Sequence, residues 1–379
     1  MKCYLDNAAT TVLSADMKSY LTTMLDVFGN PSSAHSEGVR ANRLIEEVRK
    51  KVANFINANS QSGIYFTSSG SASNALGIHG FAISNKCTIL YSPTVHKSIL
   101  KTVQNLEEYY NINNKQLKVD SCGNIDIDYL KYAMQTDYNT KLVVVDYANS
   151  EIGTIQNIKD IANVTHSCSE CAYNKLFVDC TGSISTIPLN VTSLDIDIAT
   201  FSGHKIGALK GVGVLYKKDD IKLAPLICGS QENGLFAGTE NLLGILSLGK
   251  AIELTKYNKT AWCRDFVWCH IKNISGISLI GVPLNANRLL NNLYVCIENT
   301  NGNEIVAVMD DVYGTQISTG SACNNGEPVP SIVLRSIGIN DNDIYSCIRI
   351  SFNGYETQEE LQKFCKNLRS CINILRGYI

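Results

Sequence analysis

The stretch Asp195-Ile-Asp-Ile-Ala-Thr-Phe-Ser-Gly-His-Lys205 joins a β-rich run to a short polar segment that ends in a lysine. Residues 195–201 predict a strand, and the glycine-rich stretch from Gly207 to Gly213 predicts a turn after it. In open α/β sheets, ligands bind beyond the carboxyl ends of the strands. The stretch therefore predicts a strand of such a sheet and, at its end, a candidate site.

Other β-rich runs lie on either side of this stretch and alternate with helical or loop segments. They are Gly63–Thr67, Thr88–Ser92, Lys141–Ala148, Leu176–Asp179 and Gly211–Tyr216. Residues 40–58 predict an amphipathic helix, because apolar side chains recur there at helical spacing. Alternation of strands and helices favours an α/β fold with a mostly parallel central sheet.

After about residue 240 the pattern changes. Residues 242–255 and 357–376 predict helices, and strands are expected near 277–280 and 292–298. This mixture predicts a second, smaller α+β domain. The polar run 109–115 predicts a surface loop.

Composition excludes several classes of protein. The 379 residues are 45% hydrophobic and 18% charged, which excludes a disordered chain. The net charge of −2 is too small to bind nucleic acid or an anionic membrane through charge alone. The 14 Cys are scattered, and the sequence starts with no targeting segment and holds no long apolar run. We therefore expect a reduced, cytoplasmic protein with no direct nucleic-acid or membrane partner.

Lys205 and Asp179 are the first candidates for chemistry. A lysine at a strand end, beside a hydroxyl and an imidazole, can form a Schiff base with a carbonyl cofactor such as pyridoxal phosphate. That cofactor needs an acid against its pyridinium nitrogen, and Asp179 ends an apolar strand. Each residue also has a simpler explanation, since loop lysines are usually surface residues and strand-end aspartates often cap turns.

Residues 66–74, Phe-Thr-Ser-Ser-Gly-Ser-Ala-Ser-Asn, follow a strand and open a helix, where backbone amides and hydroxyls can hold a phosphate. The same pattern also suits a simple N-cap. Cys323 lies in a small-residue, polar segment, 318–328, and is the best candidate for a nucleophile, although an incidental loop cysteine is the alternative.

His96 follows a strand and could stack on a ring or move a proton, although such a histidine is more often structural. His166, Cys168 and Cys171 suggest a metal, but no second Cys/His pair lies at zinc-site spacing. We expect no metal.

Taken in order along the chain, the motifs resemble those of the cysteine desulfurases of the NifS/IscS type, in the class V aminotransferase superfamily. The matching segments are Tyr4-Leu-Asp-Asn-Ala-Ala-Thr-Thr11, Gly29-Asn-Pro-Ser-Ser-Ala-His35, Asn149-Ser-Glu-Ile-Gly153, Ser202-Gly-His-Lys205, Gly238-Thr-Glu-Asn241, Gly320-Ser-Ala-Cys323 and Ile348-Arg-Ile-Ser351. The resemblance implies a fold-type I pyridoxal-phosphate enzyme with a large domain at 13–245 and a small domain formed by 1–12 and 246–379.

The resemblance also implies a role for each matched residue. Lys205 would bind the cofactor covalently, Asp179 would pair with its ring nitrogen and His96 would stack on its ring. The remaining cofactor contacts would come from Ser71, Ser150, Ser202, His204 and, from the other subunit of a homodimer, Thr239. Arg349 and Asn30 would hold the substrate, L-cysteine. Cys323 would take its sulfur as a persulfide, release L-alanine and pass the sulfur to an acceptor protein.

Four positions depart from the family pattern: Ala72, Ser150, Gly182 and Phe236. Ser150 and Gly182 stand where the family has an Asn and a Gln that contact the phenolic oxygen of the cofactor. We expect the loss of these contacts to weaken cofactor binding, and Gly182→Gln to restore one of them.

Two other activities remain open. A selenocysteine lyase or another carbon–sulfur lyase would share the fold, and a relative without turnover would bind only a partner. The sulfur acceptor is also open, because iron–sulfur assembly, tRNA thiolation and DNA phosphorothioation all draw on this family.

Overall fold

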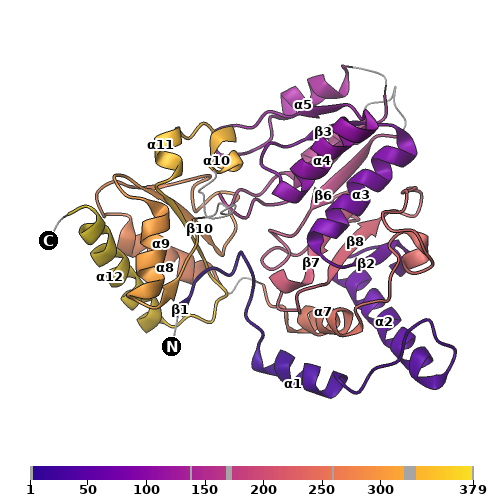
Figure 1. Cartoon of the computed structure of the whole chain (residues 1–379). Helices are drawn as coiled ribbons and strands as arrows, with labels where there is room; N and C mark the ends of the chain where they lie inside the picture. Colours follow the sequence, from indigo (N-terminus) through magenta and orange to yellow (C-terminus); the bar gives the residue numbers. More distant parts are fainter. Residues whose placement is uncertain (1–2, 137–138, 168–172, 258–259, 320–329, 378–379) are drawn as a thin grey trace.

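The computed structural model describes residues 3–136, 139–167, 173–257, 260–319 and 330–377. Figure 1 shows a large sheet with helices on both of its faces and, beside it, a smaller sheet covered by helices from the C-terminal part of the chain. The N-terminal strand lies against the smaller part, and the chain then crosses to the larger one (Figure 1).

In the described residues, the large sheet has seven strands in the order β2-β8-β7-β6-β5-β3-β4. Their bounds are β2 Ile64–Thr67, β3 Thr88–Tyr91, β4 Asn114–Gln116, β5 Lys141–Asp146, β6 Lys175–Asp179, β7 Ile198–Ser202 and β8 Gly213–Lys217. β8 is antiparallel to both of its neighbours, whereas β4, β3, β5, β6 and β7 pair in parallel. The predicted α/β fold with a mostly parallel sheet is confirmed.

Helices bury both faces of this sheet. One core contains Val143, Val145 and Val178 with helices α2 Ser36–Phe55, α5 Ile127–Met134, α6 Ile158–Ser167 and α7 Leu242–Leu254. The other contains Val144 and Phe177 with α3 Gly70–Asn85 and α4 Lys97–Tyr110. Because successive strand residues point to opposite faces, the last residues of β5 and β6 point to the side of α3 and α4.

The smaller sheet is antiparallel, with the order β12-β10-β9. Its strands are β9 Ile277–Leu279, β10 Asn292–Ile297 and β12 Cys347–Ser351. Helices α8 Ala261–Ile271, α9 Gly302–Asp311 and α12 Gln358–Leu375 cover one face, and α10 Ile332–Ser336 and α11 Asp341–Ile344 pack on the other. β1 Cys3–Tyr4 pairs in parallel with β11 Thr315–Gln316, so the N-terminus joins this part.

The separate cores support the proposed division of the chain into two domains. Helix α7 favours a boundary near residue 255 rather than after residue 245, because Leu246, Leu248 and Ala251 pack in the core of the large sheet. The first helix, α1 Ala15–Met24, also contacts α7.

Two local predictions are wrong. The run 109–115 is no simple loop: α4 continues to Tyr110, Asn111 turns the chain with φ of 53°, and β4 begins at Asn114. The polar side chains of β4 suit an edge strand. In the sheet, β4 pairs with β3 on one side. The second error concerns the start of β7, which begins at Ile198 because Asp195 has a φ of 56° and cannot lie in a strand.

Candidate active site

Three predicted site residues of the large part lie at or just after the carboxyl ends of two adjacent parallel strands, β6 and β7. Asp179 ends β6, Ser202 ends β7, and Lys205 lies in the one-turn helix η2 Gly203–Lys205 directly after β7. The register pairs Asp146, the last residue of β5, with Asp179. This edge of the sheet is where an α/β fold binds its ligand.

Lys205 is held by the N-terminal segment. Its Nζ donates hydrogen bonds to the carbonyl oxygens of Ala8 and Ala9, the second at 2.9 Å. Burial, helped by the charge of Arg349, lowers the pKa of Lys205 to about 8, against the opposing charges of Asp6 and Asp179. A lysine with this pKa is partly uncharged near neutral pH and can attack a carbonyl carbon.

Asp179 is buried and held in one orientation. Its Oδ1 accepts from the Thr181 backbone N–H at 2.8 Å, and its Oδ2 accepts from Asn74 Nδ2 at 3.0 Å. The Asn74 amide oxygen accepts in turn from the Thr200 hydroxyl. Donors to both oxygens fix the orientation of the carboxylate. Sequence reasoning missed Asn74 as a support, although it lies within the quoted run 66–74.

His96 is connected to Asp179 through two side chains. It is the N-cap of α4, and its Nδ1 lies 3.1 Å from the Ser98 backbone N and 2.8 Å from Ser98 Oγ. Ser98 Oγ accepts from the same Asn74 amide at 3.1 Å. The imidazole is exposed, so a flat ligand can reach it.

The segments that carry three of the predicted phosphate contacts, Ser71, Ser202 and His204, lie close together. A Cβ at Gly70, next to Ser71 in the first turn of α3, would lie 3.1 Å from Ser202 Cβ, so that turn contacts the end of β7. His204 lies two residues after Ser202, its Nδ1 is 3.1 Å from Thr10 Oγ1, and burial lowers its pKa to about 4. Thr239 is exposed in the loop before α7, and Asn241 of this loop donates to the Gly211 carbonyl oxygen at 2.7 Å.

Arg349 approaches the site from β12 of the smaller sheet. Its Nη2 lies 2.8 Å from Asp6 Oδ1, and its Nη1 donates to the Ser150 carbonyl oxygen at 3.3 Å. The Nε is buried and has no hydrogen-bond partner among the described residues. Arg349 therefore carries a spare donor beside Lys205. Asn30, the other predicted substrate residue, is exposed, and its Oδ1 accepts from Ser32 N within its own loop.

A small cavity joins Lys205 to two of the positions that depart from the family pattern, Ser150 and Gly182. A Cβ at Gly182 would lie 2.3 Å from the Ala148 carbonyl oxygen. Real Cβ contacts are never so short, and the obstacle is backbone, so no side chain fits without a shift of the β5–α6 segment. The expectation that Gly182→Gln restores a cofactor contact stays a prediction, and it requires this segment to shift.

A larger cavity, of about 470 Å³, also reaches Lys205. The N-terminal segment, the end of α7 and the residues after β12 line it, among them Thr11, Met17, Leu254 and Phe352. It is wide enough to admit a small molecule to the lysine.

Cys323 lies outside the described residues, in the segment 320–329. Both flanks of that segment are tied to the site. Ser318 exchanges backbone hydrogen bonds with Arg349, at 3.1 and 2.6 Å, and on the other flank Ser331 Oγ donates to Glu151 Oε2 at 2.6 Å. Ser331 also caps α10. The chain therefore leaves and re-enters the described part beside Arg349 and Glu151.

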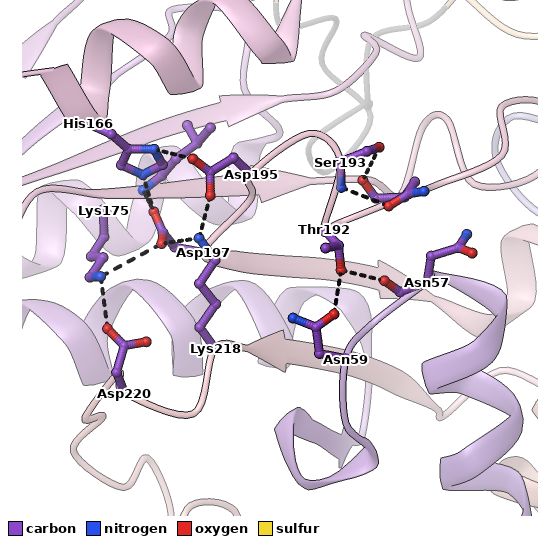
Figure 2. A network of polar contacts seen from close by, with 12 residues as sticks. Asn57, Asn59, His166, Lys175, Thr192, Ser193, Asp195, Asp197, Lys218 and Asp220 are labelled. Atoms are coloured by element: carbon purple, nitrogen blue, oxygen red, sulfur yellow. Dashed lines mark hydrogen bonds and ion pairs between the residues drawn. The ribbon is translucent and has the colours of Figure 1, made fainter.

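No cluster of three potential metal ligands occurs among the described residues. His166 lies between two carboxylates, with Nδ1 2.9 Å from Asp195 and Nε2 2.7 Å from Asp197, and Lys218 contacts both aspartates (Figure 2). Cys168 and Cys171 fall outside the described residues. Among the helices that the structure describes, none has the length and hydropathy that a membrane crossing requires.

The residues fit pyridoxal phosphate. A phosphate needs hydroxyl and backbone donors, which the first turn of α3 and Ser202 offer, and Thr181 Oγ1 is buried there without a partner among the described residues. The aldehyde needs an amine of lowered pKa, which Lys205 provides. The ring nitrogen needs a fixed carboxylate, which Asp179 provides.

Comparison with known proteins points to the same chemistry. The profile of the aminotransferase class-V family matches residues 3–364. The chain is 37% identical to the "Cysteine desulfurase IscS" of Dictyoglomus turgidum, over 98% of this chain and 95% of that protein. It is 33% identical to the "Cysteine desulfurase IscS 1" of Archaeoglobus fulgidus, over 99% and 98%.

Solved structures agree with this result. A "NIFS-LIKE PROTEIN" superposes with a TM-score of 0.89 at 30% identity, over 99% of this chain and all of that one. The structure "SspA in complex with cysteine" superposes with a TM-score of 0.81 at 30% identity, over 94% of this chain and all of that one.

Proposed function

Because the chain belongs to the class-V aminotransferase family and to its cysteine desulfurases, we propose that it takes sulfur from L-cysteine and passes it on through Cys323, with pyridoxal phosphate as its cofactor. The observation that supports this most directly is the meeting of three groups at one sheet edge. These are a half-buried lysine of lowered pKa, a carboxylate fixed by two donors, and an arginine with a spare buried N–H.

Each group has a place in the reaction. When bound, the cofactor acts as an electron sink for bonds at the substrate α- and β-carbons. Lys205 Nζ would hold the cofactor aldehyde, and its lowered pKa would let it take up a proton from the substrate. Asp179 would hold the ring nitrogen. His96 would contact the ring, and the segment around Ser71, Ser202 and His204 would hold the phosphate.

Arg349 orients the substrate. Its guanidinium now pairs with Asp6, and a substrate carboxylate would compete for the same donors and also meet the unpartnered Nε. Asn30 is proposed as a second contact to the substrate. Because Ser318 is paired with Arg349, the substrate is held next to the start of the segment that carries Cys323.

The sulfur step balances without an external oxidant. The substrate C–S bond breaks while an S–S bond forms to Cys323 Sγ, so that L-cysteine and the enzyme thiol become L-alanine and an enzyme persulfide. The two thiols bring two protons. One proton joins the electron pair of the broken C–S bond to form the new C–H bond of alanine, and the other remains on the outer sulfur of the persulfide. The persulfide then passes its outer sulfur to an acceptor, for which iron–sulfur assembly, tRNA thiolation and DNA phosphorothioation remain the candidates.

We also propose a homodimer in the cytoplasm. Thr239 is exposed and would reach the phosphate of the other subunit. Val12, Leu25, Phe28 and Val39 expose apolar side chains in the N-terminal region, as a subunit interface would require.

Two variants test the proposal. Borohydride reduction of the protein loaded with pyridoxal phosphate should attach the cofactor to the peptide of Lys205, and Lys205→Ala should abolish the attachment. Cys323→Ala should keep cofactor binding but lose sulfide release under reducing conditions and any protein-bound persulfide, whereas Cys228→Ala, at an exposed cysteine, should keep both. If Cys323→Ala releases sulfide at the wild-type rate, the lyase alternative is correct. If neither cysteine nor selenocysteine is turned over by the loaded protein, the partner-binding alternative is correct.

A further inference from the structure

A second buried carboxyl group lies beside Asp179 and has no part in the mechanism above. Asp146 ends β5 as Asp179 ends β6, and the two residues are partners in the parallel register. The residues before them, Val145 and Val178, point into the same core, so both carboxyl groups point to the opposite side of the sheet, toward α3 and α4. Their exposures are 5% and 4%.

The two carboxyl groups differ in their hydrogen bonds. Asp179 receives donors at both oxygens. Asp146 Oδ1 accepts from Thr94 Oγ1 at 3.1 Å, whereas its Oδ2 is buried with no partner in the part of the chain that the structure describes. Donors stabilise the charged form of a carboxyl group, and Asp146 lacks the second donor that Asp179 has.

The surroundings of Asp146 reinforce this difference. The elements around it carry Asp179 on β6, Tyr91 on β3, His96 before α4 and His79 on α3 as titratable groups. Burial is the largest cause that raises the pKa of Asp146, and the charge of Asp179 is a smaller one; the pKa rises to about 7. Hydrogen bonds from the neutral side chains of Thr94 and Asn149 act in the opposite direction and lower this pKa. Asp146 therefore changes charge close to neutral pH.

We propose that Asp146 is a positioning residue for the cofactor, which acts through Asp179: its buried carboxyl group, which is paired with Asp179 in the register and whose Oδ2 has no partner among the described residues, adds to the negative charge facing the ring nitrogen of pyridoxal phosphate when it is ionised. The proposal rests on the proposed function, because it takes Asp179 as the partner of that nitrogen. A second negative charge favours a protonated ring, so ionisation of Asp146 tightens cofactor binding. By linkage, the bound cationic ring favours the ionised form of Asp146.

The decisive experiment measures the affinity of the cofactor-free protein for pyridoxal phosphate between pH 6 and 8.5, in the wild type and in Asp146→Asn. Asn has the same shape and no charge, so the ratio of the two affinities removes the pH dependence that Lys205 and the free cofactor contribute. We expect this ratio to rise by about tenfold across the range, which corresponds to a coupling of one pKa unit. A ratio that stays constant while both proteins bind the cofactor would overturn the proposal.

Thr94→Val is the matched control. It keeps the carboxyl group but removes its one hydroxyl donor, so the pH at which the affinity changes should move upward, not vanish. A profile identical to that of the wild type would show that Asp146 does not set the profile. This variant also keeps the proposal testable if Asp146→Asn does not fold.

A cofactor-free readout separates this inference from the proposed function. In infrared difference spectra of the wild-type protein without cofactor, the C=O band of a protonated carboxylic acid should disappear as the pH rises through about 7, and this change should be missing in Asp146→Asn. If the wild type binds no pyridoxal phosphate, the proposed function fails, while the infrared titration still decides the state of Asp146. If the wild type shows no such band, the inference fails even when the cofactor binds.

Discussion

Replacing Asp6 with Asn is expected to lower the pKa of Lys205. Asp6 is one of two carboxylates whose charge raises that pKa, and it also balances Arg349, to which it is ion-paired at 2.8 Å. In Asp6→Asn the shape of the side chain is kept, but the guanidinium acts on Lys205 without compensation. The ammonium form of Lys205 is then less favoured, and the free amine appears at lower pH.

The size of the effect follows from the causes of the shift. The pKa of Lys205 falls from 10.5 to about 8, and this difference of about 2.5 corresponds to about 3.4 kcal/mol. Burial is the largest cause, and the charge of Asp6 is a smaller one that ranks after that of Arg349. The loss of Asp6 should therefore lower the pKa by about one unit or less. Arg349→Gln should act in the opposite direction, since it removes the cation and leaves Asp6 unopposed.

The pH dependence of cofactor attachment measures this pKa. The cofactor-free protein is mixed with pyridoxal phosphate at a series of pH values, and short borohydride pulses give the initial rate of attachment to the Lys205 peptide. The midpoint should move down in Asp6→Asn and up in Arg349→Gln. Asp128→Asn, at an exposed aspartate of α5 that pairs only locally with Lys131, should leave it unchanged. Midpoints of the two variants that coincide, or that move in the reverse order, would refute the electrostatic account.

Three further predictions concern stability. The folded-state pKa of Asp146, about 7, lies above its ordinary value of 3.8. Ionisation of Asp146 therefore destabilises the folded protein increasingly as the pH rises through that range. In urea titrations of the cofactor-free protein, Asp146→Asn should raise the free energy of unfolding by up to about 4 kcal/mol at pH 8 and by little near pH 4. His166 has a raised pKa because of its hydrogen bonds to two aspartates (Figure 2), so it stabilises the folded protein below its unfolded-state pKa, and this stabilisation is lost as the pH rises. His166→Asn should lower the free energy of unfolding by roughly 1.5–3 kcal/mol at pH 6 and by less at pH 9. An equal loss at both pH values would contradict this account. Gly182→Ala should lower the free energy of unfolding by about 1–3 kcal/mol, because the new methyl group would clash with the Ala148 carbonyl oxygen. An unchanged midpoint of thermal or urea unfolding would show that the segment between β5 and α6 shifts without a loss of stability.

The strands at the site were predictable because their signal is local. Runs such as Leu176–Asp179 are apolar on both faces, as buried parallel strands are, and each ends at a polar residue. Long amphipathic helices were predictable for the same reason. By contrast, β4 is polar and short, and only its pairing with β3 makes it a strand. A tertiary contact of this kind leaves no pattern in the sequence.

The site itself was partly predictable. Lys205 and Asp179 follow strands, and the structure places them at one edge of the sheet as parallel topology requires. The support of Asp179 by Asn74, the pairing of Asp6 with Arg349 and the register of Asp146 with Asp179 depend on how distant segments meet, and no spacing in the sequence reveals them. Gly182 is another position where the sequence alone misleads. The absence of a side chain at residue 182 suggested a lost cofactor contact, whereas in the structure it lets the backbone at Gly182 approach the backbone at Ala148 closely.

The N-terminal segment has a consequence for the order in which the protein is made. Residues 3–11 bind Lys205 and His204 on one side, and on the other they reach Gln316 and Ser351 of the smaller part, so that Asn7 bonds to a residue 344 positions away. During synthesis the first residues leave the ribosome long before those partners exist. The lysine therefore gains its carbonyl acceptors in their final place only when β12 has been synthesised and has folded. A nascent chain that lacks β12 holds Lys205 without its N-terminal clamp.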